Sequence, residues 1–133
     1  GSFGNKFNFK DDEFDLIIDV VSSMSLSDKE RAKYVSECIR VLKPGGHMFV
    51  KTLCKDGDKN AEYLLEHFPG KEKNTYVMPG TDIVERVFSK DDIESLYREF
   101  KIQTLERKHS YTQMDGKSYK RFFWNIYLEK TGI

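Results

Sequence analysis

Apolar residues along this chain recur with two periods, and each change of period marks an expected element. From Phe14 to Val20 the chain is almost continuously apolar, apart from Asp15 and Asp19. Such a β-branched run is typical of a strand that is covered on both faces, as in a parallel sheet. The run from His47 to Leu53 has the same character and predicts a second buried strand.

The segment between these two strands has helical spacing. Ser27 and Glu30 form a capping box, in which each side chain can bond the backbone N–H of the other residue. Pro44 cannot continue a helix, and the two glycines after it allow a sharp reversal of the chain. A helix is therefore predicted over about residues 28–42, with a right-handed crossover and both strands parallel. Its apolar stripe consists of Ala32, Val35, Ile39 and Leu42.

The second half of the chain predicts two short helices and two strands. Asp58 and Ser89 can each cap a helix, the second running to about residue 100, and the segment between them has no assigned structure. Residues 101–109 predict a strand, 110–119 a loop and 120–130 a last strand. Because its apolar residues alternate with others, the last strand is expected near a sheet edge and antiparallel. These alternating residues are Phe122, Trp124, Ile126 and Leu128.

The composition indicates one globular domain over residues 1–133, in which Gly1 and Ser2 look like a tag remnant. Lys and Arg number 22, as do Asp and Glu, so no overall field favours nucleic acid or anionic lipid. The two cysteines, Cys38 and Cys54, do not form a disulfide framework, and their spacing is not that of a metal site. No apolar run is long enough to span a bilayer, and a cytoplasmic, reducing setting is expected.

Three stretches in order resemble the second half of a class I S-adenosylmethionine-dependent methyltransferase. They are KFNFKDDEFDLIIDVVSSMSL, RVLKPGGHMFVKTL and RVFSKDDIESLYREFKIQTLE. The resemblance implies that residues 14–19 are the family's fourth strand and that residues 40–53 lead into its fifth. It implies a three-layer, Rossmann-like α/β half-domain, whose mostly parallel sheet ends in an antiparallel hairpin.

The resemblance also implies S-adenosylmethionine as cofactor. Asp19 would face the sulfonium, unless it only solvates the strand end. Phe7 matches, with Phe9, an apolar pair near the adenine, unless both are core residues. Lys51 and Cys54 end the second strand, and they are interpreted as a solvated lysine and a free thiol. No catalytic residue or methyl acceptor is identified, and the implied cofactor contacts are Asp19, Val20, Val21, Ser22 and Phe7.

The chain departs from the family pattern in one respect. Its nine glycines contain no spaced-glycine loop, and the family's loop and ribose-binding carboxylate would both precede residue 1. One hypothesis is therefore methyl transfer within a longer or completed catalytic domain, with weak or absent cofactor binding by this chain alone. The alternative is a non-catalytic half-domain for oligomerisation or partner binding. A phosphate or nucleotide binder is a weaker third interpretation, because no phosphate-cradling loop is present.

The resemblance leads to a further expectation about assembly. The family's fourth strand lies beside the first, which this sequence lacks, so residues 14–20 would form an apolar sheet edge. Such an edge is a template for another chain. The chain is therefore expected to self-associate as a twofold dimer through this strand, unless residues 3–9 fold back over it.

Overall fold

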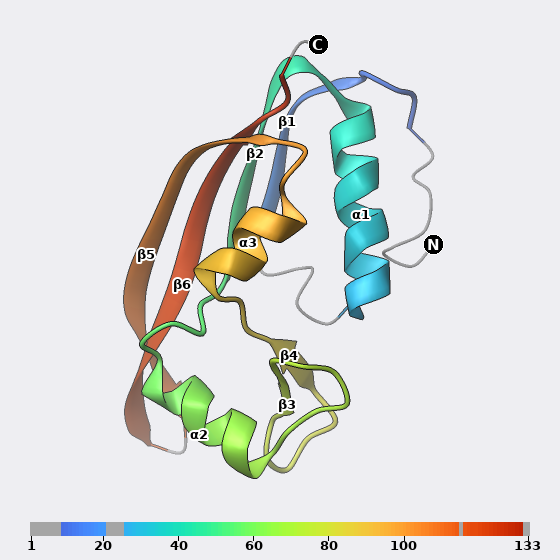
Figure 1. The fold of residues 1–133 in the computed structure, drawn as a ribbon. Coiled ribbons are helices and arrows are strands. Elements are labelled where there is room, and N and C mark those ends of the chain that lie inside the picture. The colour runs from blue at the N-terminus through green and yellow to red at the C-terminus, as the bar shows by residue number, and fades with distance from the viewer. Residues whose placement is uncertain (1–8, 21–25, 115, 132–133) are drawn as a thin grey trace.

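The computed structural model describes residues 9–20, 26–114 and 116–131, and it contains a mixed four-stranded sheet (Figure 1). The strand order is β1-β2-β6-β5. The β1 and β2 strands are parallel, whereas β6 is antiparallel to both β2 and β5. The bounds are Phe14–Val20 for β1, Leu42–Leu53 for β2, Lys101–Met114 for β5 and Lys117–Glu129 for β6. The predicted parallel pair and the terminal antiparallel hairpin are confirmed.

Side-chain caps fix where the helices begin. The α1 helix (Asp28–Val41) starts at the predicted capping box, in which the Glu30 N–H donates to Ser27 Oγ over 3.1 Å. Ser27 N–H donates in return to Glu30 Oε1, also over 3.1 Å. The α2 helix (Lys59–His67) is capped by Asp58, and α3 (Lys90–Leu96) by Ser89. The α3 helix is shorter than predicted, although the apolar residues after it, Tyr97 and Phe100, remain buried.

The Pro-Gly-Gly reversal lies within β2, because this strand begins immediately after α1. The pairing of β1 with β2 shifts register between Phe14 and Leu16, and Lys43 to Gly46 form the irregular stretch. Gly45 has a φ of +81°, which favours glycine. A Cβ on Gly46 would lie 2.8 Å from the Lys43 carbonyl oxygen and 3.2 Å from that of Asp15.

We expect Gly46→Ala to lower the free energy of unfolding by about 1–3 kcal/mol, because the backbone of two strands must move to admit the methyl group. Gly45→Ala meets no atom within 4 Å, and its positive φ alone should cost about 1 kcal/mol. Urea denaturation of both variants measures the difference. A Gly46→Ala chain as stable as Gly45→Ala would contradict the close approach.

One expectation for the terminal strands is wrong. Residues 110–119 are not a loop, since β5 runs to Met114 and β6 starts at Lys117, with these two residues paired. A left-handed Gly116, at φ +73°, allows a tight turn, and hairpin pairing then extends both strands. The β6 strand is antiparallel to both neighbours and lies second from the edge, because β5 pairs with its outer side and forms the edge itself. Local alternation does not reveal which neighbour a strand acquires.

The helices α1 and α3 cover one face of the sheet (Figure 1). They bury Tyr34, Val35, Cys38 and Ile93 with Met48 and Val50 of β2 and Trp124, Ile126 and Leu128 of β6. The α2 helix and a small hairpin, β3 (Thr75–Val77) with β4 (Val84–Arg86), pack around Leu53 at the end of β2. The described residues thus form the sheet and one helical layer of the expected Rossmann-like α/β fold.

Candidate functional site

The carboxyl ends of β1 and β2 meet at one edge of the sheet, where an open α/β sheet binds its ligands. Val20 pairs with Lys51, and Asp19 pairs with Val50. The two candidate residues of β1 point to opposite faces, as strand geometry requires. Asp19 is buried, whereas Val20 is 51% exposed.

Asp19 lies beneath the helical layer. Burial raises the pKa of the Cys38 thiol on α1 to about 12, and the charge of Asp19 contributes to that rise. Burial likewise raises the pKa of the Tyr97 hydroxyl, again with a contribution from Asp19. The carboxylate is therefore close enough to both groups to affect their ionisation. A ligand at this sheet edge would contact the exposed Val20 directly. Asp19, buried on the other face of the strand, would act on the ligand only through its charge.

The end of β2 presents no activated nucleophile. Cys54 is buried, burial raises its thiol pKa to about 12, and the thiol donates to the Asp56 carbonyl oxygen at 3.4 Å. Thr52 is also buried. The Lys51 ammonium lies 4.6 Å from the centre of the Phe123 ring, so the lysine is half-buried in a cation–π contact rather than freely solvated.

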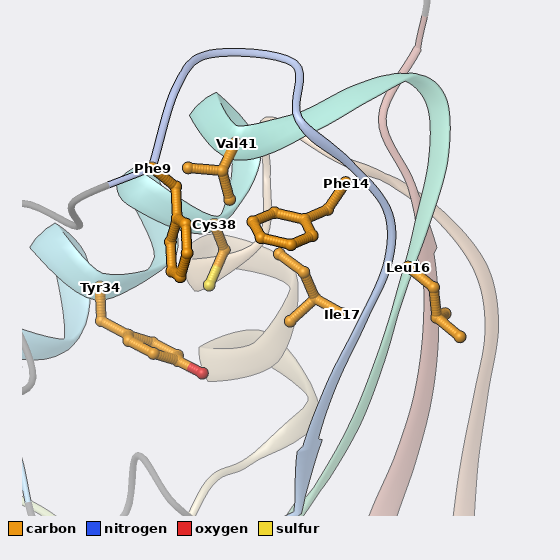
Figure 2. Close-up of a pocket in the computed structure, with 7 residues that line it drawn as sticks. All are labelled: Phe9, Phe14, Leu16, Ile17, Tyr34, Cys38 and Val41. Atoms are coloured by element: carbon orange, nitrogen blue, oxygen red, sulfur yellow. The ribbon is translucent and has the colours of Figure 1, made fainter.

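Phe9 lies at the other end of β1. Phe9 and Phe14 both line an apolar cavity of about 240 Å³ between β1 and α1, and Figure 2 shows their side chains close together. The two rings meet edge to face with centroids 4.9 Å apart. Val20 is six residues beyond Phe14, about 20 Å along an extended strand. Phe9 is 50% exposed and packs its ring on Phe14 at the amino end of β1, away from the Val20 edge. Phe7, Val21 and Ser22 lie outside the described residues.

A network of ion pairs around two buried arginines next to this site was not anticipated from the sequence. Arg31 is 2% exposed, and its guanidinium donates to Asp28 Oδ1 at 2.7 Å and to the Leu26 carbonyl oxygen. Arg86 of β4 lies 3.5 Å from Asp28 Oδ1 and 3.5 Å from Asp92 Oδ2 of α3. Burial lowers the pKa of Arg31. The network ties the start of α1 to β4 and α3.

The pattern around Arg31 could have revealed this network. Arg31 stands four residues before Val35 and seven before Cys38, on the apolar face of α1. A charge at such a position must be paired when the face is buried. Both guanidiniums also lie over the ring of Phe88, at 5.2 Å for Arg31 and 4.7 Å for Arg86.

Residues 9–20, 26–114 and 116–131 contain no group of three or more His, Cys, Asp or Glu side chains arranged to hold a metal ion. None of the helices in the same ranges has the length and apolar character needed to cross a membrane.

Known proteins resemble this chain in sequence and in fold. A family model described as a methyltransferase domain matches residues 3–50. Phosphoethanolamine N-methyltransferase 1 of Triticum aestivum is 25% identical over 142 residues, which cover 96% of this chain. The match extends over only 28% of that protein's length.

Solved structures with the same fold are also longer than this chain. An S-adenosylmethionine-dependent methyltransferase of Methanosarcina mazei superposes with a TM-score of 0.84 at 22% identity, over 98% of this chain and 65% of its own. The 1,6-didemethyltoxoflavin-N1-methyltransferase of Burkholderia thailandensis, solved with S-adenosylhomocysteine, gives 0.60 at 15% identity over 91% and 45%. At these identities the structural matches establish the fold alone.

Proposed function

We propose that this chain, which has the sequence pattern and fold of the second half of a class I S-adenosylmethionine-dependent methyltransferase, takes part in methyl transfer from S-adenosylmethionine. The observation that carries the proposal is the parallel β1–β2 pair, whose carboxyl ends meet at Val20 and Lys51. In a sheet of this type the ligand lies at that edge. The family model covers β1 and most of β2, ending at Val50.

The residues at this edge fit one wall of a cofactor site. Val20 presents an exposed apolar surface, which suits contact with the methionine part of the cofactor. Asp19, behind it, supplies a negative charge that would favour a nearby sulfonium. Val21 and Ser22 follow directly in the sequence and lie outside the described residues, so their contacts with the cofactor stay predictions. The described residues present no comparable group for the ribose at this edge, so we assign them one part of the site.

Methyl transfer from a sulfonium requires that the two reactants be correctly positioned, more than it requires acid–base groups. The bound cofactor supplies a methyl group on an activated sulfonium, which an acceptor displaces in line. Holding the two reactants in line lowers the barrier, as in other bimolecular reactions on enzymes. The unreactive Cys54 thiol fits this chemistry, because no residue needs to form a covalent intermediate. The role proposed for this chain is to shape the wall at which the acceptor approaches.

Cofactor binding tests the proposal directly. The longest natural protein that contains these 133 residues should bind S-adenosylmethionine with micromolar affinity, about −8 kcal/mol. Val20→Arg should weaken this binding at least about tenfold, or about 1.4 kcal/mol, because the long side chain and its cation enter the sulfonium side of the site. The 133-residue chain alone should bind far more weakly. Isothermal titration calorimetry at neutral pH measures all three.

Tyr111→Arg is the matched control. Tyr111 is 64% exposed and lies on β5, the outermost strand on the side of the sheet away from β1. It should leave cofactor affinity unchanged. A longer protein that shows no binding at millimolar cofactor would refute the enzymatic proposal and favour a non-catalytic half-domain. Equal affinities for the Val20→Arg and unaltered proteins would instead show that the cofactor site lies elsewhere.

A further inference from the structure

Three guanidinium groups line one cavity between the start of α1, the end of β4 and α3. The cavity has a volume of about 200 Å³, and Arg31, Arg86 and Arg98 line it together with the ring of Phe88. One water molecule needs only about 10–15 Å³ of such volume, so there is room for a polyatomic ligand. None of the described residues that line the cavity belongs to β1, beside which the resemblance places further strands.

Arg86 is a buried cation without a close anion. Its residue is 8% exposed, and Nη1 donates to the Val87 carbonyl oxygen at 2.6 Å. Its two ion-pair partners, Asp28 and Asp92, lie 3.5 Å away, beyond the roughly 2.7–2.9 Å of a charge-assisted hydrogen bond. Nε is buried and has no hydrogen-bond partner in the part of the chain that the structure describes. A buried guanidinium in this state costs stability, which an added anion would offset.

The two carboxylates beside Arg86 are already bonded to other groups. Asp28 Oδ1 accepts from the Arg31 guanidinium at 2.7 Å. Asp92 Oδ2 accepts from the Ser89 N–H at 3.0 Å, which is part of the cap of α3. Neither carboxylate can move closer to Arg86 without weakening these bonds.

The charge of the lining also favours an anion. Three arginines and two aspartates line the cavity, which gives a net charge of +1. Glu72, whose charge also acts on Arg31, is not among the lining residues. Arg98 is exposed and donates to the Ser95 carbonyl oxygen at 3.0 Å. Because a guanidinium has five N–H donors, Arg98 can bind a ligand as well.

We propose that this cavity binds a small oxyanion, a carboxylate or phosphate group, through Arg86 and Arg98. Both kinds of group match the planar fork of a guanidinium and can accept two parallel hydrogen bonds from it. The Phe88 ring supports the arrangement, because the guanidiniums of Arg31 and Arg86 lie 5.2 Å and 4.7 Å from its centre. This inference does not depend on the proposed methyl transfer.

Inorganic phosphate and acetate are the probes that test the proposal. Each is titrated into the ¹⁵N-labelled 133-residue chain at neutral pH and constant ionic strength. At least one of them should shift the Nε–Hε signals of Arg86 and Arg98 saturably, with a dissociation constant of about 1 mM or lower. Chloride should not. The tighter probe identifies the group, phosphate or carboxylate, that the natural ligand carries.

Two variants should change the affinity for the tighter probe in opposite directions. Arg98→Gln should weaken binding at least about tenfold, because a charge-assisted hydrogen bond is lost. Asp28→Asn should strengthen it about threefold, because a negative charge leaves the lining. Arg107→Gln is the matched control and should bind normally. Arg107 is an exposed arginine on β5 that also donates to a backbone carbonyl oxygen, that of Asp56 at 3.0 Å.

Three results would overturn the proposal. The first is a pair of arginine signals that neither probe shifts saturably. The second is an Arg98→Gln chain that binds as tightly as the Arg107→Gln control. The third is a folded Asp28→Asn chain that binds more weakly than the unaltered chain. If circular dichroism shows that Asp28→Asn does not fold, Arg98→Lys replaces it, and it should recover only part of the affinity because lysine keeps the charge without the fork.

Discussion

Alkylation of Cys38 and Cys54 at pH 8 should be at least about a thousandfold slower in the folded chain than in the unfolded chain, because only the thiolate reacts. Burial raises both thiol pKa values from 9.0 to about 12. Each full unit lowers the thiolate fraction about tenfold when the pH lies below the pKa. Both side chains are also buried, so the reagent must wait for an opening.

Iodoacetamide labelling followed by mass spectrometry measures this difference. Urea-unfolded chain provides the reference rate, and Cys38→Ala and Cys54→Ala assign each site. Rapid labelling of native Cys54 would contradict the burial seen at the end of β2, and it would reopen a nucleophilic role for that thiol.

The same pKa shifts give stability a pH dependence with a definite sign. Between about pH 9 and 12 the unfolded thiols lose their protons while the folded ones keep them, so rising pH favours unfolding. The stabilisation that the two buried, protonated thiols contribute is fully present below about pH 9 and is lost between about pH 9 and 12. Burial raises the pKa of the Tyr76 and Tyr97 hydroxyls in the same direction, which adds to the loss.

Asp58→Ala should destabilise the chain by about 3 kcal/mol, because this one carboxylate serves two elements. Its Oδ1 accepts from the Ala61 N–H at 2.9 Å and so caps α2, and its Oδ2 accepts from the Phe122 N–H of β6 at 2.9 Å. The Arg121 Nε also lies 3.9 Å from Oδ2. Removal costs a cap of about 1 kcal/mol, and an unpaired N–H in the sheet costs about 1–3 kcal/mol more.

Two further variants separate these contributions. Asp58→Asn should lose less than Asp58→Ala, because its amide has one acceptor oxygen and can serve only one of the two N–H groups. Ser27→Ala removes a cap alone, at the start of α1, and should cost about 1 kcal/mol. Urea denaturation gives all three values. If Asp58→Ala cost no more than Ser27→Ala, the bond from β6 to Asp58 would contribute little.

The parallel β1–β2 pair and its helix could be predicted because their information is local. The capping box, the helical stripe and Pro-Gly-Gly are all read within a few residues of where they act. The resemblance to class I S-adenosylmethionine-dependent methyltransferases was predicted from ordered segments, and the matched family model and the shared fold confirm it. The cofactor contacts at Asp19, Val20, Val21, Ser22 and Phe7 stay predictions.

Only the tertiary structure decided which residues of distant segments meet. The sequence determined that Phe122, Trp124, Ile126 and Leu128 share a strand face, but β5 pairing on the outer side of β6 made that strand interior. It determined that Asp58 caps a helix, but not that the same carboxylate holds β6. It placed Asp19 at a strand end, and the packing of α1 and α3 buried it. The physical reason is common to these cases. Caps and periodicity depend on neighbours a few positions away, whereas strand order and burial depend on contacts that the folded chain alone brings together.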